Sequence, residues 1–221
     1  MKVRLTNLLL ISILSVSIAP AQEGLRLGVN LDPMASWFSP KTNKIDRDGT
    51  RPGISGGLLV EYYFHSNYGL TTGLNIGTMG GSLMYDEAVS INAGGESAVQ
   101  LPAGATVVFN TSYISLPIGL KLKTNEIGYF TYYAQLGFNQ QINIGSRASS
   151  TGNNLNKDNV PKEINLLNMS YYFGAGIEYN IGGQTSLLAG LMFNNGFIDV
   201  LSNNKHKAVL NYLTIRVGVL F

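Results

Sequence analysis

LTIRVGVLF, the stretch from Leu213 to Phe221, alternates strictly between two kinds of residue and ends on an aromatic one. One of its faces carries only large apolar residues, namely Leu213, Ile215, Val217, Val219 and Phe221. The other face carries Thr214, Arg216, Gly218 and Leu220. A period of two with one apolar face predicts a half-buried β-strand. The fold then depends on which solvent the apolar face meets.

The amino-terminal residues are typical of a cleavable signal peptide. Residues 1–4 are basic, residues 8–19 form an apolar run too short to span a bilayer, and Ala19-Pro20-Ala21 supplies small residues for cleavage. We therefore expect residues 1–21 to be a signal peptide, cleaved near Ala21, and residues 22–221 to form one exported domain. The alternative, an uncleaved anchor helix, fits the short apolar run less well.

The composition indicates a membrane protein without membrane-spanning helices. Charged residues make up 13% of the chain, against about 25% in soluble domains. Beyond the signal peptide, no apolar run reaches the ~18 residues that a membrane helix needs. Loss of Lys2 and Arg4 with the signal peptide equalises basic and acidic residues, and the chain has no Cys. The balanced charge argues against a nucleic-acid surface, and the lack of Cys excludes disulfides and thiolate metal sites. Without a membrane helix, a closed barrel is the remaining way to cross a membrane.

The chain divides into eight segments that predict an all-β fold, an eight-stranded antiparallel up-and-down transmembrane β-barrel. Short turns follow the second, fourth and sixth segments, whereas long polar loops at 37–52, 86–106 and 147–165 follow the first, third and fifth. Turns at one end and loops at the other are typical of outer-membrane barrels, whose turns lie in the periplasm. The expected strands are 25–36, 53–64, 68–85, 107–123, 129–146, 166–181, 185–201 and 208–221, with a shorter fourth loop at 202–207.

The alternation within these segments predicts which side chains meet lipid. In 114–123, large apolar residues alternate with Ser115, Pro117, Gly119, Lys121 and Lys123. We expect the apolar face to contact lipid and the small or charged face to line a narrow lumen. A bulge or bend is expected at Pro117, which lacks a backbone donor. Two aromatic girdles are expected at the interfaces, with Tyr62, Phe64, Phe130, Tyr179 and Phe221 near the turns and Trp37, Tyr85, Phe138, Tyr171 and Phe197 near the loops.

Five charged residues lie at the alternate strand positions that we expect to face the lumen, a property that we call lumen-facing parity: Arg26, Glu61, Lys121, Glu178 and Arg216. Each lies a few residues from the turn end of its strand, so we expect them at one level at the periplasmic end. Enclosed charges need partners, and side chains fill the lumen of an eight-stranded barrel. The pattern therefore predicts a structural ionic cluster that plugs the barrel. A gate or a proton path is the alternative interpretation.

Motifs that could support catalysis are few. A serine nucleophile needs a base such as His beside it, and His206 with Ser202 and Asp199 is the only candidate set. No motif supports this set, so we expect no catalytic, cofactor-binding or metal-binding residue. The segment 46–49, DRDG, resembles the start of a calcium loop but lacks the later ligands.

Four segments carry a resemblance to a known family: GLRLGVN at 24–30, SLPIGLK at 115–121, GAGIEY at 174–179 and IRVGVLF at 215–221. They resemble the outer-membrane β-barrel family of Bacteroidota, often called PorT-like, of the eight-stranded OmpA or OmpX type. The resemblance covers the whole mature chain. It implies a location in the cell outer membrane, contact with outer-membrane lipid, and assembly by the barrel-assembly machinery, for which Phe221 would be the terminal residue. The named family member belongs to a protein-secretion apparatus.

These observations predict a non-enzymatic integral outer-membrane barrel with a structural or accessory role, a plugged lumen and surface-exposed loops. We expect no cofactor and no nucleic-acid partner, and we expect the loops to offer contacts to a secretion or surface protein partner. Three alternatives stay open: a subunit of a secretion apparatus, an outer-leaflet lipid-modifying enzyme, and a secreted soluble barrel that binds an apolar ligand.

Overall fold

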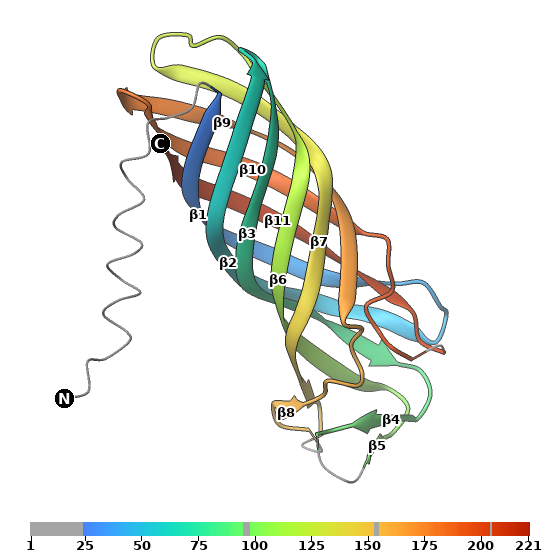
Figure 1. The fold of residues 1–221 in the computed structure, drawn as a ribbon. Helices are drawn as coiled ribbons and strands as arrows, with labels where there is room; N and C mark the ends of the chain where they lie inside the picture. Colours follow the sequence, from blue (N-terminus) through green and yellow to red (C-terminus); the bar gives the residue numbers. More distant parts are fainter. Residues whose placement is uncertain (1–23, 95–97, 153–154, 204) are drawn as a thin grey trace, which may run out of the picture.

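The computed structural model describes residues 24–94, 98–152, 155–203 and 205–221, which form one barrel whose strands run obliquely around its axis (Figure 1). The expected signal peptide lies outside these residues. Eight long strands build the wall: β1 (Leu25–Pro40), β2 (Ile45–His65), β3 (Tyr68–Tyr85), β6 (Ala105–Lys123), β7 (Phe130–Ser150), β9 (Leu167–Gly182), β10 (Thr185–Gly196) and β11 (Ala208–Leu220). Three short strands lie in the loops: β4 (Val89–Asn92), β5 (Ala98–Leu101) and β8 (Asp158–Asn159).

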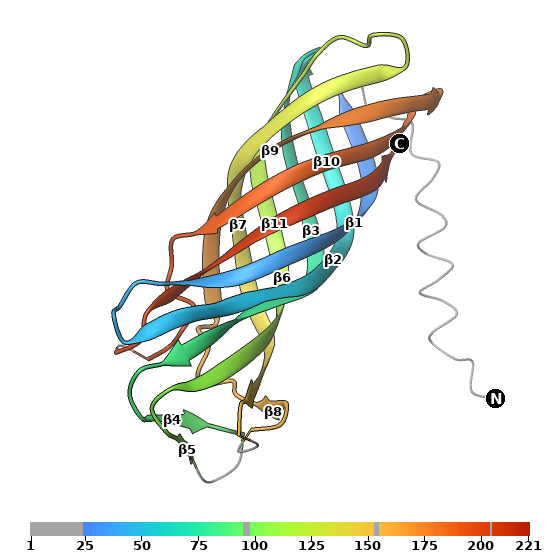
Figure 2. The ribbon, with the colours of Figure 1, turned by 180° about the vertical axis from the view of Figure 1, so that it is seen from behind.

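The ring closes because each long strand pairs with its neighbours and β1 pairs with β11. The predicted eight-stranded antiparallel barrel is confirmed. Within the described residues, no helix is long and apolar enough to cross a bilayer. Figure 2 shows the carboxy terminus beside the start of β1. There the Phe221 amide donates to the Leu27 carbonyl at 2.7 Å, and the Leu27 amide donates back at 3.3 Å. The last residue therefore continues the ladder that closes the barrel.

The outer face of the wall is apolar, as the alternation predicts. Leu116, Phe173 and Ile215 are 42%, 54% and 53% exposed, although large apolar side chains of this kind are usually buried in soluble proteins. Their neighbours in sequence point inward and are mostly small or polar. A soluble ligand-binding barrel would carry its large apolar residues inside, so the parity argues against that alternative. The other outward apolar residues include Val29, Leu31, Ile54, Leu58, Leu70, Leu74, Ile76, Ile114, Ile118, Leu120, Leu136, Ile142, Leu187, Leu191, Leu213 and Val217.

The strands extend further toward the loop end than the sequence predicted. β1 and β2 continue to Pro40 and from Ile45, so most of the expected loop 37–52 is strand. β7 continues to Ser150, and the loop between β3 and β6 contains the β4–β5 hairpin. β10 ends at Gly196, so the fourth loop is longer than expected. Polar residues mark the point where a strand leaves lipid, but backbone pairing continues beyond that point.

The β3–β6 ladder is interrupted at Pro117, where a bulge or a bend was expected. The register is the same on both sides, with Thr72 opposite Ile118 and Asn75 opposite Ser115, so there is no bulge, but the pairs between these two are missing. One prediction for β3 is wrong. Tyr85, expected in the outer girdle, is 2% exposed. It shares the odd parity of the lumen-facing residues of β3, so its ring points inward.

The loop end of the lumen contains an apolar core, where a polar lumen was expected. Phe38 and Phe109 meet there edge to face with centroids 6.0 Å apart, and both are fully buried. Loop residues pack into the same core, among them Leu155 and Ile164. The loops thus fold over the barrel mouth and bury apolar side chains that the strands direct inward. The core also includes Met34, Ile45, Met79, Leu83, Tyr85, Val89, Ile91, Leu101, Val107, Tyr113, Val160, Val200, Leu201, Leu210 and Tyr212.

Candidate functional site: the barrel lumen

The turn end of the lumen contains four of the five charged residues selected from the sequence. Lys121 Nζ lies 2.6 Å from Glu61 Oε1 and 2.5 Å from Glu178 Oε1. Glu178 also accepts from Arg26 Nη1 at 2.6 Å. Lys121 is fully buried, and the side chains of Glu61 and Glu178 are nearly so. We call Arg26, Glu61, Lys121 and Glu178 the ion network.

Strand register explains why these residues meet. Arg26 on β1 lies directly opposite Glu61 on β2. Lys121 on β6 lies opposite the small residue Gly69 on β3, which leaves room for its long side chain. Glu178 reaches the network from β9. Two negative and two positive charges are therefore brought together from four strands.

Neutral side chains that the sequence analysis missed complete the ion network. The Tyr63 hydroxyl donates to Glu61 Oε2 at 2.9 Å, and Ser186 Oγ accepts from Arg26 Nη2 at 2.9 Å. The Tyr133 ring covers Lys121 Nζ at 4.5 Å from its centroid, a cation–π contact. Tyr63 and Tyr133 could have been found from the sequence, because each has the lumen-facing parity of its strand.

Arg216 differs from the prediction, because it lies apart from the ion network and pairs with Asp32. Its Nη2 lies 3.1 Å from Asp32 Oδ2, and its Nη1 donates to Gln135 at 3.4 Å. The reason is the register of the closing seam. Gly28 lies opposite Leu220, and Arg216 comes four residues earlier on β11, between the pairs Leu31–Val217 and Met34–Thr214. Arg216 therefore lies deeper in the lumen than Arg26.

A band of uncharged polar side chains separates the Asp32–Arg216 pair from the apolar core. Asn139 Nδ2 donates to the Tyr212 hydroxyl at 2.7 Å, and Asn168 Nδ2 donates to Gln141 Oε1 at 2.7 Å. Gln141 Nε2 in turn donates to Ser115 Oγ at 3.1 Å. From turn end to loop end, the lumen is therefore filled by the ion network, a polar band and the apolar core.

The loops are tied together around the apolar core. Glu163 Oε1 accepts from the backbone and side-chain amides of Asn92 at 2.9 and 2.7 Å, which joins the third loop to the β4–β5 hairpin. His206 Nε2 lies 3.2 Å from Glu87 Oε1, and Lys44 donates to the same carboxylate at 3.0 Å. The Lys44 hydrogen bonds lower the pKa of Glu87. The first, second and fourth loops thus meet at Glu87.

The candidate catalytic set is not assembled. His206 is buried against the Tyr85 ring, at 5.1 Å between centroids, and contacts Glu87 instead. Ser202 donates to the Lys162 carbonyl, and Asp199 pairs with Lys207 at 3.8 Å. No group of three or more His, Cys, Asp or Glu that could hold a metal ion occurs in the part of the chain that the structure describes.

The fold and the lumen together define an integral membrane β-barrel whose interior is occupied by its own side chains. The sequence profile of the outer membrane protein beta-barrel domain matches residues 19–202, most of the chain. The chain therefore belongs to this family of outer-membrane proteins, and the protein is located in the cell outer membrane.

Several solved structures are similar to this chain. Neisserial surface protein A is 15% identical, with 89% of this chain and 96% of that chain covered and a TM-score of 0.45. Ail, the attachment invasion locus protein of Yersinia pestis, is 14% identical over 89% and 99%, with a TM-score of 0.42. The outer membrane protease OmpT from Escherichia coli is 10% identical over 89% and 96%, with a TM-score of 0.44. No curated protein sequence matches the chain.

Proposed function

We propose that this protein is a non-enzymatic outer-membrane barrel with a structural or accessory role, whose plugged lumen supports a rigid loop surface outside the cell. The observation that carries the proposal is the filling of the lumen by the chain's own side chains. The ion network, the polar band and the apolar core follow one another along the barrel axis. Eight strands enclose only enough space for side chains, so diffusive transport has no path.

The loop surface is the part available to partners. Loop ties such as Glu163 to Asn92 and His206 to Glu87 hold neighbouring loops in one arrangement. A surface fixed in advance loses little conformational entropy when it binds. Such a surface suits an accessory protein that presents a contact face to another surface protein.

Conductance across a planar lipid bilayer tests the proposal. The purified protein, refolded and inserted into the bilayer, should give no stable channel at moderate voltage. A general porin inserted in the same way provides the positive control. Steady single-channel steps from the wild-type protein would refute a plugged lumen.

Two more specific roles, in a secretion apparatus and in lipid modification, need separate tests. Membership of a PorT-like secretion apparatus rests on the sequence resemblance, and pull-down from detergent-solubilised membranes should then recover the other secretion subunits. A lipid-modifying role would require His206, so alanine at this position should change the mass profile of lipid A. We expect an unchanged profile, because His206 contacts Glu87 and Tyr85 rather than Ser202.

A further inference from the structure

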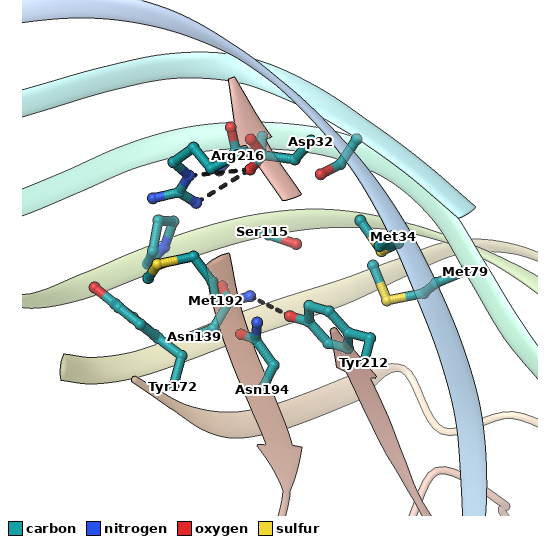
Figure 3. Close-up of a pocket in the computed structure, with 13 residues that line it drawn as sticks. Asp32, Met34, Met79, Ser115, Asn139, Tyr172, Met192, Asn194, Tyr212 and Arg216 are labelled. Atoms are coloured by element: carbon teal, nitrogen blue, oxygen red, sulfur yellow. Dashed lines mark hydrogen bonds and ion pairs between the residues drawn. The ribbon is translucent and has the colours of Figure 1, made fainter. Parts of the chain in front are cut away.

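A small chamber lies in the polar band of the lumen (Figure 3). Its free volume is about 30 Å³, and side chains from all eight long strands line it. Asp32 and Arg216 form its charged side, and Asn75, Ser115, Asn139 and Asn194 contribute polar atoms. The ion network lies toward the turn end and the apolar core toward the loop end, so the chamber lies between them inside the barrel.

Three oxygen atoms of the chamber lining lack a donor among the described residues: Asp32 Oδ1, Asn75 Oδ1 and Asn139 Oδ1. Their residues are 2%, 7% and 9% exposed. For Asp32 and Asn139 the other polar atom of the side chain is engaged, since Arg216 donates to Asp32 Oδ2 and Asn139 Nδ2 donates to the Tyr212 hydroxyl. All three oxygens are hydrogen-bond acceptors, so they cannot form hydrogen bonds with one another. A buried acceptor without a donor destabilises the folded state.

The charge of the lining decides which ligand could supply the donors. Asp32 and Arg216 neutralise each other at 3.1 Å, so the chamber has no net negative charge to balance a cation. A cation beside Asp32 would also face the guanidinium of Arg216. Water donates hydrogen bonds without adding charge, and a chamber of about 30 Å³ has room for about two molecules.

We propose that this chamber is an internal hydration site for two water molecules. The two molecules together have four O–H groups. Three of these satisfy Asp32 Oδ1, Asn75 Oδ1 and Asn139 Oδ1, and the fourth joins the two waters. Because the three acceptors belong to β1, β3 and β7, which do not pair with one another, the waters hydrogen-bond strands that the sheet ladder leaves unconnected.

A crystal structure of the full chain, with one crystal soaked in rubidium chloride, tests the site. We expect two ordered solvent peaks within hydrogen-bond distance of the three oxygens, without anomalous scattering from rubidium. Anomalous signal at the site would make it a cation site and overturn the proposal. A chamber without solvent peaks, in which the oxygens find protein donors, would overturn it as well.

The variant Asn75→Leu provides a second arm. It removes one acceptor while the Asp32–Arg216 pair stays intact, so one solvent peak should be lost and the peak beside Asp32 should remain. In detergent micelles, the Asn139 side-chain amide protons should show cross-relaxation with long-lived water in the wild type. Absence of that signal in folded wild-type protein would contradict bound water, and this measurement does not depend on the variant folding.

Discussion

Neutralising Glu178 is the most direct test of the ion network. The variant Glu178→Gln keeps the shape of the side chain and removes the charge that both Arg26 and Lys121 contact, at 2.6 and 2.5 Å. Removing one partner from a buried ion pair costs about 3–5 kcal/mol, because the other charge stays buried. Here Lys121 retains Glu61 at 2.6 Å, and the glutamine oxygen can still accept one bond. We therefore expect the free energy of unfolding to fall by about 3 kcal/mol, the lower end of that range.

Urea unfolding in lipid vesicles, followed by the fluorescence of Trp37, measures this loss. Trp37 is the only tryptophan in the chain, and it leaves the membrane region when the barrel unfolds. With a denaturant slope of about 1–3 kcal/mol/M, a loss of 3 kcal/mol lowers the urea midpoint by roughly 1–3 M. The matched control is Glu126→Gln, the same change in an exposed turn, where the carboxylate accepts from Asn180. It should stay within about 0.5 kcal/mol of wild type.

A double variant separates pairing from mere loss of packing. Lys121→Met leaves Glu61 buried at 1% exposure, and among the described residues the Tyr63 hydroxyl is then its remaining donor. Adding Glu61→Gln removes that uncompensated charge while Arg26 still pairs with Glu178. The double variant should therefore be more stable than Lys121→Met alone. Equal midpoints for Glu178→Gln and Glu126→Gln, or a double variant less stable than the single one, would refute the reasoning.

Three further predictions concern the lipid face, the loops and the closing residue. Leu116→Arg on the outward face of β6 should lower the free energy of unfolding by ~2–4 kcal/mol. Asn110→Arg, on the same face but nearer the loop end, should lower it by ~0–1 kcal/mol. Equal losses in urea titration would contradict the lipid-facing assignment. Lys44 lowers the pKa of Glu87, so the contact is present when Glu87 is ionised and is lost only as the pH falls through this lowered pKa, below the usual range of a glutamate. Lys44→Gln should raise this pKa in a carbon-13 NMR titration, and an unchanged value would exclude the cause given. Phe221→Ala should reduce the amount of folded barrel in the membrane fraction, judged by heat-modifiable gel mobility; an unaltered yield would remove its role in assembly.

Parity along single strands was sufficient to predict the barrel and most of the ion network. Arg26, Glu61, Lys121 and Glu178 were identifiable because each lies on the non-lipid face of its strand, near its turn end. Glu61, Lys121 and Glu178 could be placed at one level because each precedes, by a few residues, the short turn that ends its strand. The level of Arg216 could not be fixed in this way. It depends on the β1–β11 seam, which no turn joins.

The partner of Asp32 also depends on the register between β1 and β11, which the sequence does not provide. Asp32 has the same parity as Arg26 on β1, so the sequence alone marks it as lumen-facing. Its partnership with Arg216 follows only once Gly28 is placed opposite Leu220. Ring closure is a long-range constraint, and one sequence contains no local signal for it.

The apolar core at the loop end was missed for a different physical reason. Alternation shows that two faces differ, but it does not show which solvent each face meets. At the middle of the barrel, lipid lies outside, and the large residues Leu116 and Ile215 face it. Above the lipid, water lies outside and the folded loops exclude it from the interior, so the large residues Phe38 and Phe109 point inward. The same chain therefore reverses its apolar side along one barrel, as a transmembrane barrel continuous with a soluble core must do. This reversal explains why the strands continue past the polar residues at which the sequence predicted their ends, since backbone pairing serves both environments equally.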